Sequence, residues 1–177
     1  MKKVLFIGLI LFVVSTLFAQ DNLSALIPMP NKIISSSSGS LELQGKSIAC
    51  YVQADSLSFE LKKVSSIFEK RFGLDIKRVT KKSRAQIHLL VDKSLSKNDH
   101  YQLSVNEKRL EIRGASAAAV CYGLMTLDQL LVGDVCATKQ QKITAIEIDD
   151  CPRFGYRALM AQSETLGDCV KILIFAS

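Results

Sequence analysis

ITAIEIDDCPRFGYRALM, at residues 143–160, is the stretch of this sequence that decides the fold. Apolar and polar residues alternate from Ile146 to Asp149, as they do in a strand with one buried face. Pro152 then removes a backbone N–H donor and ends the strand. Cations and aromatic residues follow, a composition suited to docking one structural unit on another: Arg153, Phe154, Tyr156 and Arg157. The stretch therefore predicts a last strand that runs into a domain junction.

The N-terminus has the layout of a secretory signal peptide. Lys2 and Lys3 precede an apolar run over residues 4–19, and polar residues begin at Gln20. We expect cleavage near Ala19, with an uncleaved anchor as the alternative. The run is short for a membrane span and no basic cluster follows it, so we expect no stable span in the mature chain. The predicted location is exported, either periplasmic or extracellular.

The charge balance argues against a nucleic-acid partner. The formal net charge of +6 falls by two when Lys2 and Lys3 leave with the signal peptide, so the mature chain is only mildly basic. The densest basic run is interpreted as a solvated sheet edge that its charges protect from strand pairing: Lys77, Arg78, Lys81, Lys82 and Arg84. The length that remains suits one domain.

Cysteine and histidine provide no sign of a metal site. The odd number of cysteines leaves at least one thiol without an intramolecular partner: Cys50, Cys121, Cys136, Cys151 and Cys169. We favour buried free thiols at Cys50 and Cys121 over a disulfide framework. His88 and His100 are isolated in the sequence, without ligands at zinc spacing. We therefore expect no zinc site.

The body of the chain predicts alternating strands and helices. Residues 26–30 form an edge segment because they contain two prolines, and residues 35–39 form a flexible turn. A helix is expected at 56–72, capped by Asp55 or Ser56 and ended by Gly73. Further strands are expected at residues 40–43, 47–52, 75–80 and 85–91.

A β-hairpin is the clearest local signal. Two alternating runs, 101–105 and 108–112, are separated by a very short polar loop that begins with Asn106. Gly114 closes the hairpin. Ser116 is expected to cap a second helix that continues to about Val132.

Four motifs in order make the sequence resemble the N-terminal region of family 20 glycoside hydrolases, the β-N-acetylhexosaminidases. They are LIPMP at 26–30, EIRGAS at 111–116, AAVCYGLMTLDQLL at 118–131 and DDCPRFGYR at 149–157. The resemblance covers about residues 26–160. It implies an α/β (α+β) fold, a single small domain whose mostly antiparallel sheet carries two helices on one face. In the family this domain packs against a catalytic (β/α)8 barrel.

The resemblance also implies where the chemistry is located. The family hydrolyses terminal N-acetylhexosamine residues by substrate-assisted catalysis, with an Asp and a Glu that lie in the barrel. Because this mechanism needs neither a metal nor a cofactor, the resemblance implies no metal and no cofactor. The match ends after Met160, and the family's Asp and sugar-binding Arg positions are occupied by Gln162 and Thr165. We therefore divide the chain into a signal peptide (1–19), a non-catalytic domain (20–150), a linker into the barrel (151–160) and a divergent tail (161–177). A frameshift in a longer gene is our hypothesis for the tail.

No residue of the sequence is predicted to be catalytic. Asp149 and Asp150 are neighbours on a strand and point to opposite faces, so they cannot flank one glycosidic bond. The other acidic residues near the hairpin are interpreted as solvated surface, and Ser116 as a helix cap: Asp99, Glu107 and Glu111. The predicted functional motif is the domain junction, composed of Pro152, Arg153, Phe154, Tyr156 and Arg157.

Two functions remain open at this point. The first is the N-terminal fragment of an exported β-N-acetylhexosaminidase, inactive by itself, whose full-length parent acts on N-acetylhexosamine-containing glycans. Its exposed junction surface would favour self-association. The second is a stand-alone exported module that binds a glycan or a protein.

Overall fold

The computed structural model describes residues 26–97, 99–133 and 141–151 of the chain. The predicted signal peptide, the junction motif from Pro152, the tail, Cys136 and Cys169 lie outside the described residues. No helix within these ranges is long and apolar enough to cross a membrane.

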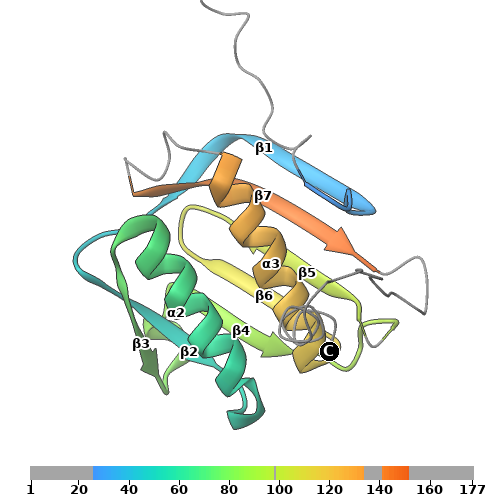
Figure 1. The fold of residues 1–177 in the computed structure, drawn as a ribbon, viewed down its shortest axis with the longest axis horizontal. Helices are drawn as coiled ribbons and strands as arrows, with labels where there is room; N and C mark the ends of the chain where they lie inside the picture. The colour runs from blue at the N-terminus through green and yellow to red at the C-terminus, as the bar shows by residue number, and fades with distance from the viewer. Residues whose placement is uncertain (1–25, 98, 134–140, 152–177) are drawn as a thin grey trace, which may run out of the picture.

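The domain is a small α+β fold with one seven-stranded sheet and two helices on one of its faces (Figure 1). The order across the sheet is β1-β7-β5-β6-β4-β2-β3. The strands are β1 (Lys32–Glu42), β2 (Ser47–Val52), β3 (Asp75–Val79), β4 (Ile87–Val91), β5 (Tyr101–Val105), β6 (Leu110–Gly114) and β7 (Lys142–Asp150). The helices are α2 (Ser58–Phe72) and α3 (Ala117–Gly133), with single 3-10 turns η2 (Asp55–Leu57) and η3 (Lys82–Arg84).

The sheet is mixed, which corrects the expectation of a mostly antiparallel one. β7 pairs antiparallel with β1 and β5, and β5 pairs antiparallel with β6. The other three pairs, β6 with β4, β4 with β2 and β2 with β3, are parallel. Helix α2 connects β2 to its neighbour β3, and a helical crossover of this kind returns the chain in the same direction.

The flexible turn predicted at 35–39 is also wrong, because this segment lies inside β1. β1 pairs with β7 from Lys32 to Glu42, with a register shift between Ser35 and Ser40. Gly39 has a φ of 118°, a conformation that favours glycine. The sequence signal of serines and a glycine thus marks a bulge within an edge strand.

Helix α2 begins differently from the prediction and ends as predicted. Its N-cap is Leu57, without a side-chain capping bond, and the Asp55 carboxylate accepts a hydrogen bond from Arg78 instead. Gly73 adopts the predicted left-handed conformation with φ 68°. The side of α2 that faces the sheet is buried: Val64, Ile67, Phe68 and Phe72. Arg71 joins α2 to α3 through bonds of 2.9 and 2.7 Å to Asp128 Oδ1.

Helix α3 lies close to the sheet because two glycines allow the approach. A Cβ at Gly114 would lie 2.5 Å from the backbone nitrogen of Val120, and a Cβ at Gly123 would lie 2.7 Å from Ile112 Cγ2. The start of α3 is capped as predicted, since Ser116 Oγ accepts from the N–H of Ala119 at 3.2 Å.

The predicted hairpin is confirmed. β5 and β6 pair from Tyr101 opposite Gly114 to Val105 opposite Leu110, and alternate residues of both strands are buried. Asn106 Oδ1 accepts from the N–H groups of Lys108 and Arg109, which holds the turn. The hairpin therefore presents its polar residues on the sheet face that carries no helix.

Candidate functional site

A buried polar cluster lies on the open face of the sheet, opposite the helices. His88 on β4 is 2% exposed, and its register partner on β6 is Glu111. His88 Nδ1 lies 3.0 Å from Glu111 Oε2, while Nε2 lies 3.1 Å from the carbonyl oxygens of Lys82 and Ala85. Both ring nitrogens therefore lie within hydrogen-bond distance of oxygen atoms, from Glu111 on one side and from Lys82 and Ala85 on the other.

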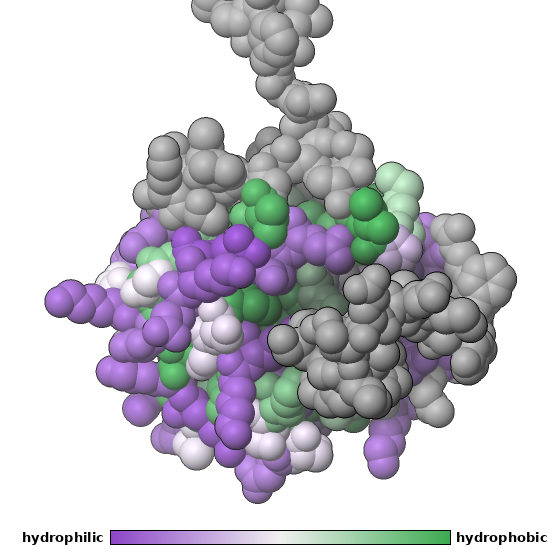
Figure 2. All heavy atoms as spheres, viewed as in Figure 1, coloured by the Kyte–Doolittle hydropathy of each residue, from purple (hydrophilic) through white to green (hydrophobic). Residues whose placement is uncertain are grey.

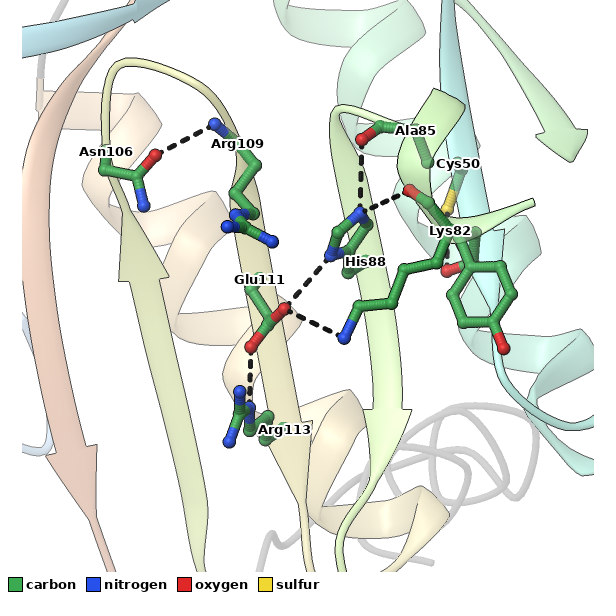
Figure 3. A network of polar contacts seen from close by, with 9 residues as sticks. Cys50, Lys82, Ala85, His88, Asn106, Arg109, Glu111 and Arg113 are labelled. Atoms are coloured by element: carbon green, nitrogen blue, oxygen red, sulfur yellow. Dashed lines mark hydrogen bonds and ion pairs between the residues drawn. The ribbon is translucent and has the colours of Figure 1, made fainter.

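Cations surround the Glu111 carboxylate. Arg113 Nε donates to Glu111 Oε1 at 2.6 Å, and Lys82 Nζ lies 3.5 Å from Oε2. Figure 3 shows these side chains converging on Glu111 from β4, β6 and η3. Burial alone would raise the pKa of Glu111, but the hydrogen bonds from His88 and Arg113 and the charges of Arg113 and Lys82 outweigh it. They lower the pKa to about 2. Glu111 is thus a fixed anion, and not the solvated surface residue predicted from sequence.

A second network on the same face is centred on Asp149. His100 Nε2 lies 2.8 Å from Asp149 Oδ1, and Gln102 Nε2 donates to Oδ2 at 2.9 Å. Burial opposes ionisation of Asp149, but the hydrogen bonds from Gln102 and His100 and nearby positive charge lower its pKa. Ser96 Oγ lies 3.2 Å from His100 Nδ1. Ser96 is exposed and lies on a turn in which the backbone N–H of His100 donates to the carbonyl oxygen of Lys97. The turn itself brings Ser96 beside His100. The contact is therefore local, and we assign it no catalytic role.

The structure separates Asp149 from Asp150, as predicted. Asp150 Oδ1 accepts from the backbone N–H of Asn31 at 3.0 Å. Together with Asp99 it lines a different hollow of about 200 Å³, between residues 26–28 and α3. Glu107 lies at the hairpin loop, beside the bulge at Gly39. Asp99 and Asp150 thus line one hollow, whereas Asp149 lies in the network with His100, so the two neighbouring aspartates do not flank one site.

Sequence reasoning missed the partners of both histidines, which are not isolated in the fold. His88 and Glu111 are 23 residues apart, and His100 and Asp149 are 49 apart. Only the strand register brings them together. The described residues contain no group of three or more His, Cys, Asp or Glu residues that could hold a metal ion.

The described cysteines are thiols. Cys50 is fully buried on β2, as predicted, and burial raises its pKa to about 12, although the charge of Arg78 opposes this. Cys121 and Cys151 are half-buried, and neither forms a disulfide with another described cysteine.

The arrangement defines a small α+β domain with polar networks on one face and helices on the other. The family model for glycosyl hydrolase family 20, domain 2, matches residues 23–151. The chain therefore belongs to glycosyl hydrolase family 20, and the matched residues correspond to domain 2 of that family.

Similar proteins point to the same family. The chain is 30% identical over 146 residues to a beta-hexosaminidase of Porphyromonas gingivalis, covering 76% of this chain and 18% of that protein. It is 32% identical over 74 residues to beta-hexosaminidase B of Pseudoalteromonas piscicida, covering 41% of this chain and 9% of that protein. The chain thus spans less than a fifth of the length of these relatives.

Solved structures agree on the fold. The beta-N-acetylhexosaminidase of Bacteroides fragilis matches with a TM-score of 0.59 and 23% identity, over 75% of this chain and 26% of that one. The N-acetyl-beta-hexosaminidase of Streptomyces plicatus matches with a TM-score of 0.64 and 16% identity, over 76% and 28%. At these identities the likeness establishes the fold alone.

Proposed function

We propose that this domain is the non-catalytic N-terminal domain of an exported β-N-acetylhexosaminidase, which supports a separate catalytic barrel and does not hydrolyse glycans itself. The observation that carries the proposal is the match of residues 23–151 to domain 2 of the family. Coverage of only 18% of the Porphyromonas relative supports a role as one part of such an enzyme.

The helix layer is the surface proposed to dock on the catalytic barrel. Along its 17 residues α3 carries one charged side chain, Asp128, and its outward side combines exposed apolar residues with the partly exposed Asp128 and Gln129. Met125 and Val132 on α3 are 38% and 54% exposed, and Phe59 on α2 is 62% exposed.

The surroundings of these residues are consistent with a docking face. Ile27 and Met29 are also exposed. The side chain of Gln129 on α3 accepts from the backbone N–H of Ile27 and donates to its carbonyl oxygen, which holds Ile27 beside the helix. Figure 2 views this face and shows hydrophilic residues gathered over its left part, with separate hydrophobic residues near its upper edge. Left uncovered, this surface would favour self-association.

Two further parts of the proposal concern the ends of the chain. Export is supported by Lys2 and Lys3 followed by the apolar residues 4–19. The junction role is supported by the match of Pro152, Arg153, Phe154, Tyr156 and Arg157 to the family's motif before the barrel. A signal peptidase cleavage assay and N-terminal sequencing of the secreted protein would test export.

The direct test is enzymatic. The purified chain should give no turnover of a chromogenic N-acetylglucosaminide, and measurable turnover would refute the non-catalytic role. A chimera in which residues 20–151 replace the corresponding domain of the Porphyromonas enzyme should retain activity. Met125→Lys with Val132→Lys in this chimera should lower its melting temperature and activity. The matched control is Thr144→Lys, at an exposed position of β7. Equal effects of both changes would contradict docking through the helix layer.

The second candidate function is the stand-alone module. The polar open face of the sheet favours it, because glycan binding there would need no barrel. Retention on chitin without turnover supports this alternative, provided that the chimera above is inactive.

A further inference from the structure

A continuous row of side chains, all polar except Ile34 at one end, crosses the open face of the sheet. Strand register places Ile34 opposite Glu147, Glu147 opposite Ser104, Ser104 opposite Glu111 and Glu111 opposite His88. Residues directly opposite one another project from the same face. The row therefore runs from β1 to β4 on the side that carries no helix.

The surface along this row is hollowed. One hollow of about 230 Å³ is lined mainly by polar residues: Gln102, Ser104, Glu111, Arg113 and Glu147. A second hollow of about 450 Å³ shares Ser104 and Glu147 with the first and continues past Ile34 to the hairpin loop. We call the two together the open-face groove. Its floor consists of four paired strands, β1, β7, β5 and β6, so its shape is rigid.

Hydrogen-bonding groups in the groove are available to a ligand. Both oxygens of Glu111 are already used by His88, Lys82 and Arg113, and Gln102 Nε2 by Asp149. The carbonyl oxygen of Gln102 is left, and so are the terminal amino groups of Arg113. Ser104 and Glu147 make no side-chain hydrogen bond to any other described residue, and Glu147 is exposed.

These groups suit a ligand rich in hydroxyls. Three acceptors (Glu147, Ser104 and Gln102) lie beside one donor, Arg113. An anion would be repelled by Glu147, and the two cations beside Glu111, Lys82 and Arg113, are each already in contact with its carboxylate. Ile34, 47% exposed at the end of the row, offers an apolar contact for the C–H face of a sugar ring.

We propose that the open-face groove binds a short, uncharged glycan strand, with Glu147 and Ser104 accepting from sugar hydroxyls and Arg113 donating to a sugar oxygen. The domain would thus hold a substrate chain on the sheet face opposite the helices. The choice of an N-acetylhexosamine glycan rests on the proposed function, whereas the groove itself rests on the geometry.

The test is an NMR titration of the isotope-labelled chain with an N-acetylglucosamine tetramer, with affinity measured by calorimetry. We expect amide shifts in β5, β6 and β7 and none in α2. Ser104→Val should weaken binding about tenfold, the effect of losing one hydrogen bond to a ligand, and Glu147→Gln should weaken it less, because a neutral acceptor replaces a charged one. Two matched controls should bind like the parent: Glu69→Gln at an exposed position of α2, and Thr144→Val on β7. Circular dichroism melts confirm that each variant is folded.

The outcomes separate the groove from the proposed function. Absence of shifts at millimolar tetramer and at millimolar cello-oligosaccharide, or shifts confined to the helix layer, would overturn the groove. Groove variants that bind as tightly as the parent would do the same. Groove shifts with the cello-oligosaccharide alone would support the groove and count against the hexosamine specificity of the proposed function.

Discussion

Replacing Glu111 by Gln should remove a large, acid-sensitive part of the stability of this domain. The Glu111 pKa falls from 4.5 to about 2 on folding. At about 1.4 kcal/mol for each pH unit, this difference corresponds to about 3 kcal/mol of unfolding free energy. Because the folded-state pKa is the lower one, this contribution is complete above pH 4.5 and is lost as the pH falls from 4.5 towards 2.

The assay is urea denaturation of the parent and of Glu111→Gln at several pH values between 7 and 2. At pH 6 the variant should be less stable by about 3 kcal/mol, and the gap should close near pH 2. Since Glu111 is only 12% exposed, 0.5 M salt should reduce the gap only slightly. The control is Glu42→Gln, which breaks an exposed ion pair with Lys142 and should change stability little. A gap of the same size at pH 6 and pH 2 would refute the electrostatic explanation.

Three further predictions concern packing, the helix pair and the thiols. Gly114→Ala should destabilise the domain by at least about 2 kcal/mol, because the new methyl group meets the backbone of α3; a melting temperature equal to that of the parent would contradict this. A double-mutant cycle on Arg71 and Asp128 should give a coupling of about 1 kcal/mol or less, since both side chains are partly exposed; a coupling several times larger would show a stronger link between the helices. Iodoacetamide at pH 8 should label Cys151 and leave Cys50 unmodified until urea unfolds the chain, as mass mapping would reveal; labelling of Cys50 in the folded protein would contradict its burial.

The sequence predicted the elements whose determinants are local. Apolar spacing located both helices, Ser116 marked the start of α3, Gly73 marked the end of α2, and Asn106 marked the hairpin turn. Each of these depends on residues within a few positions of one another.

The parts that it missed depend on contacts between distant residues. The segment from Ser35 to Gly39 has turn composition, yet pairing with β7 draws it into a bulged strand. Asp55 has the composition of a cap, yet Arg78 on β3 binds its carboxylate. The polar networks of the open face cannot be predicted before the strand register is known, because each joins residues separated by a long stretch of chain.

The histidine on β4 gives a physical reason for the network around Glu111. β4 reads IHLLV, with four consecutive buried residues, so its apolar pattern alone does not determine which side faces the helices. A slip of one residue would exchange the two faces of the strand. In the observed register His88 reaches Glu111, whereas a slipped strand would turn the imidazole into the apolar layer under α3 without a partner. Burying a hydrogen-bonded polar group adds little net stability compared with apolar packing, but burying a polar group without a partner is costly. We therefore infer that the His88–Glu111 contact mainly excludes the wrong register, and that by doing so it fixes the row of side chains along the open-face groove.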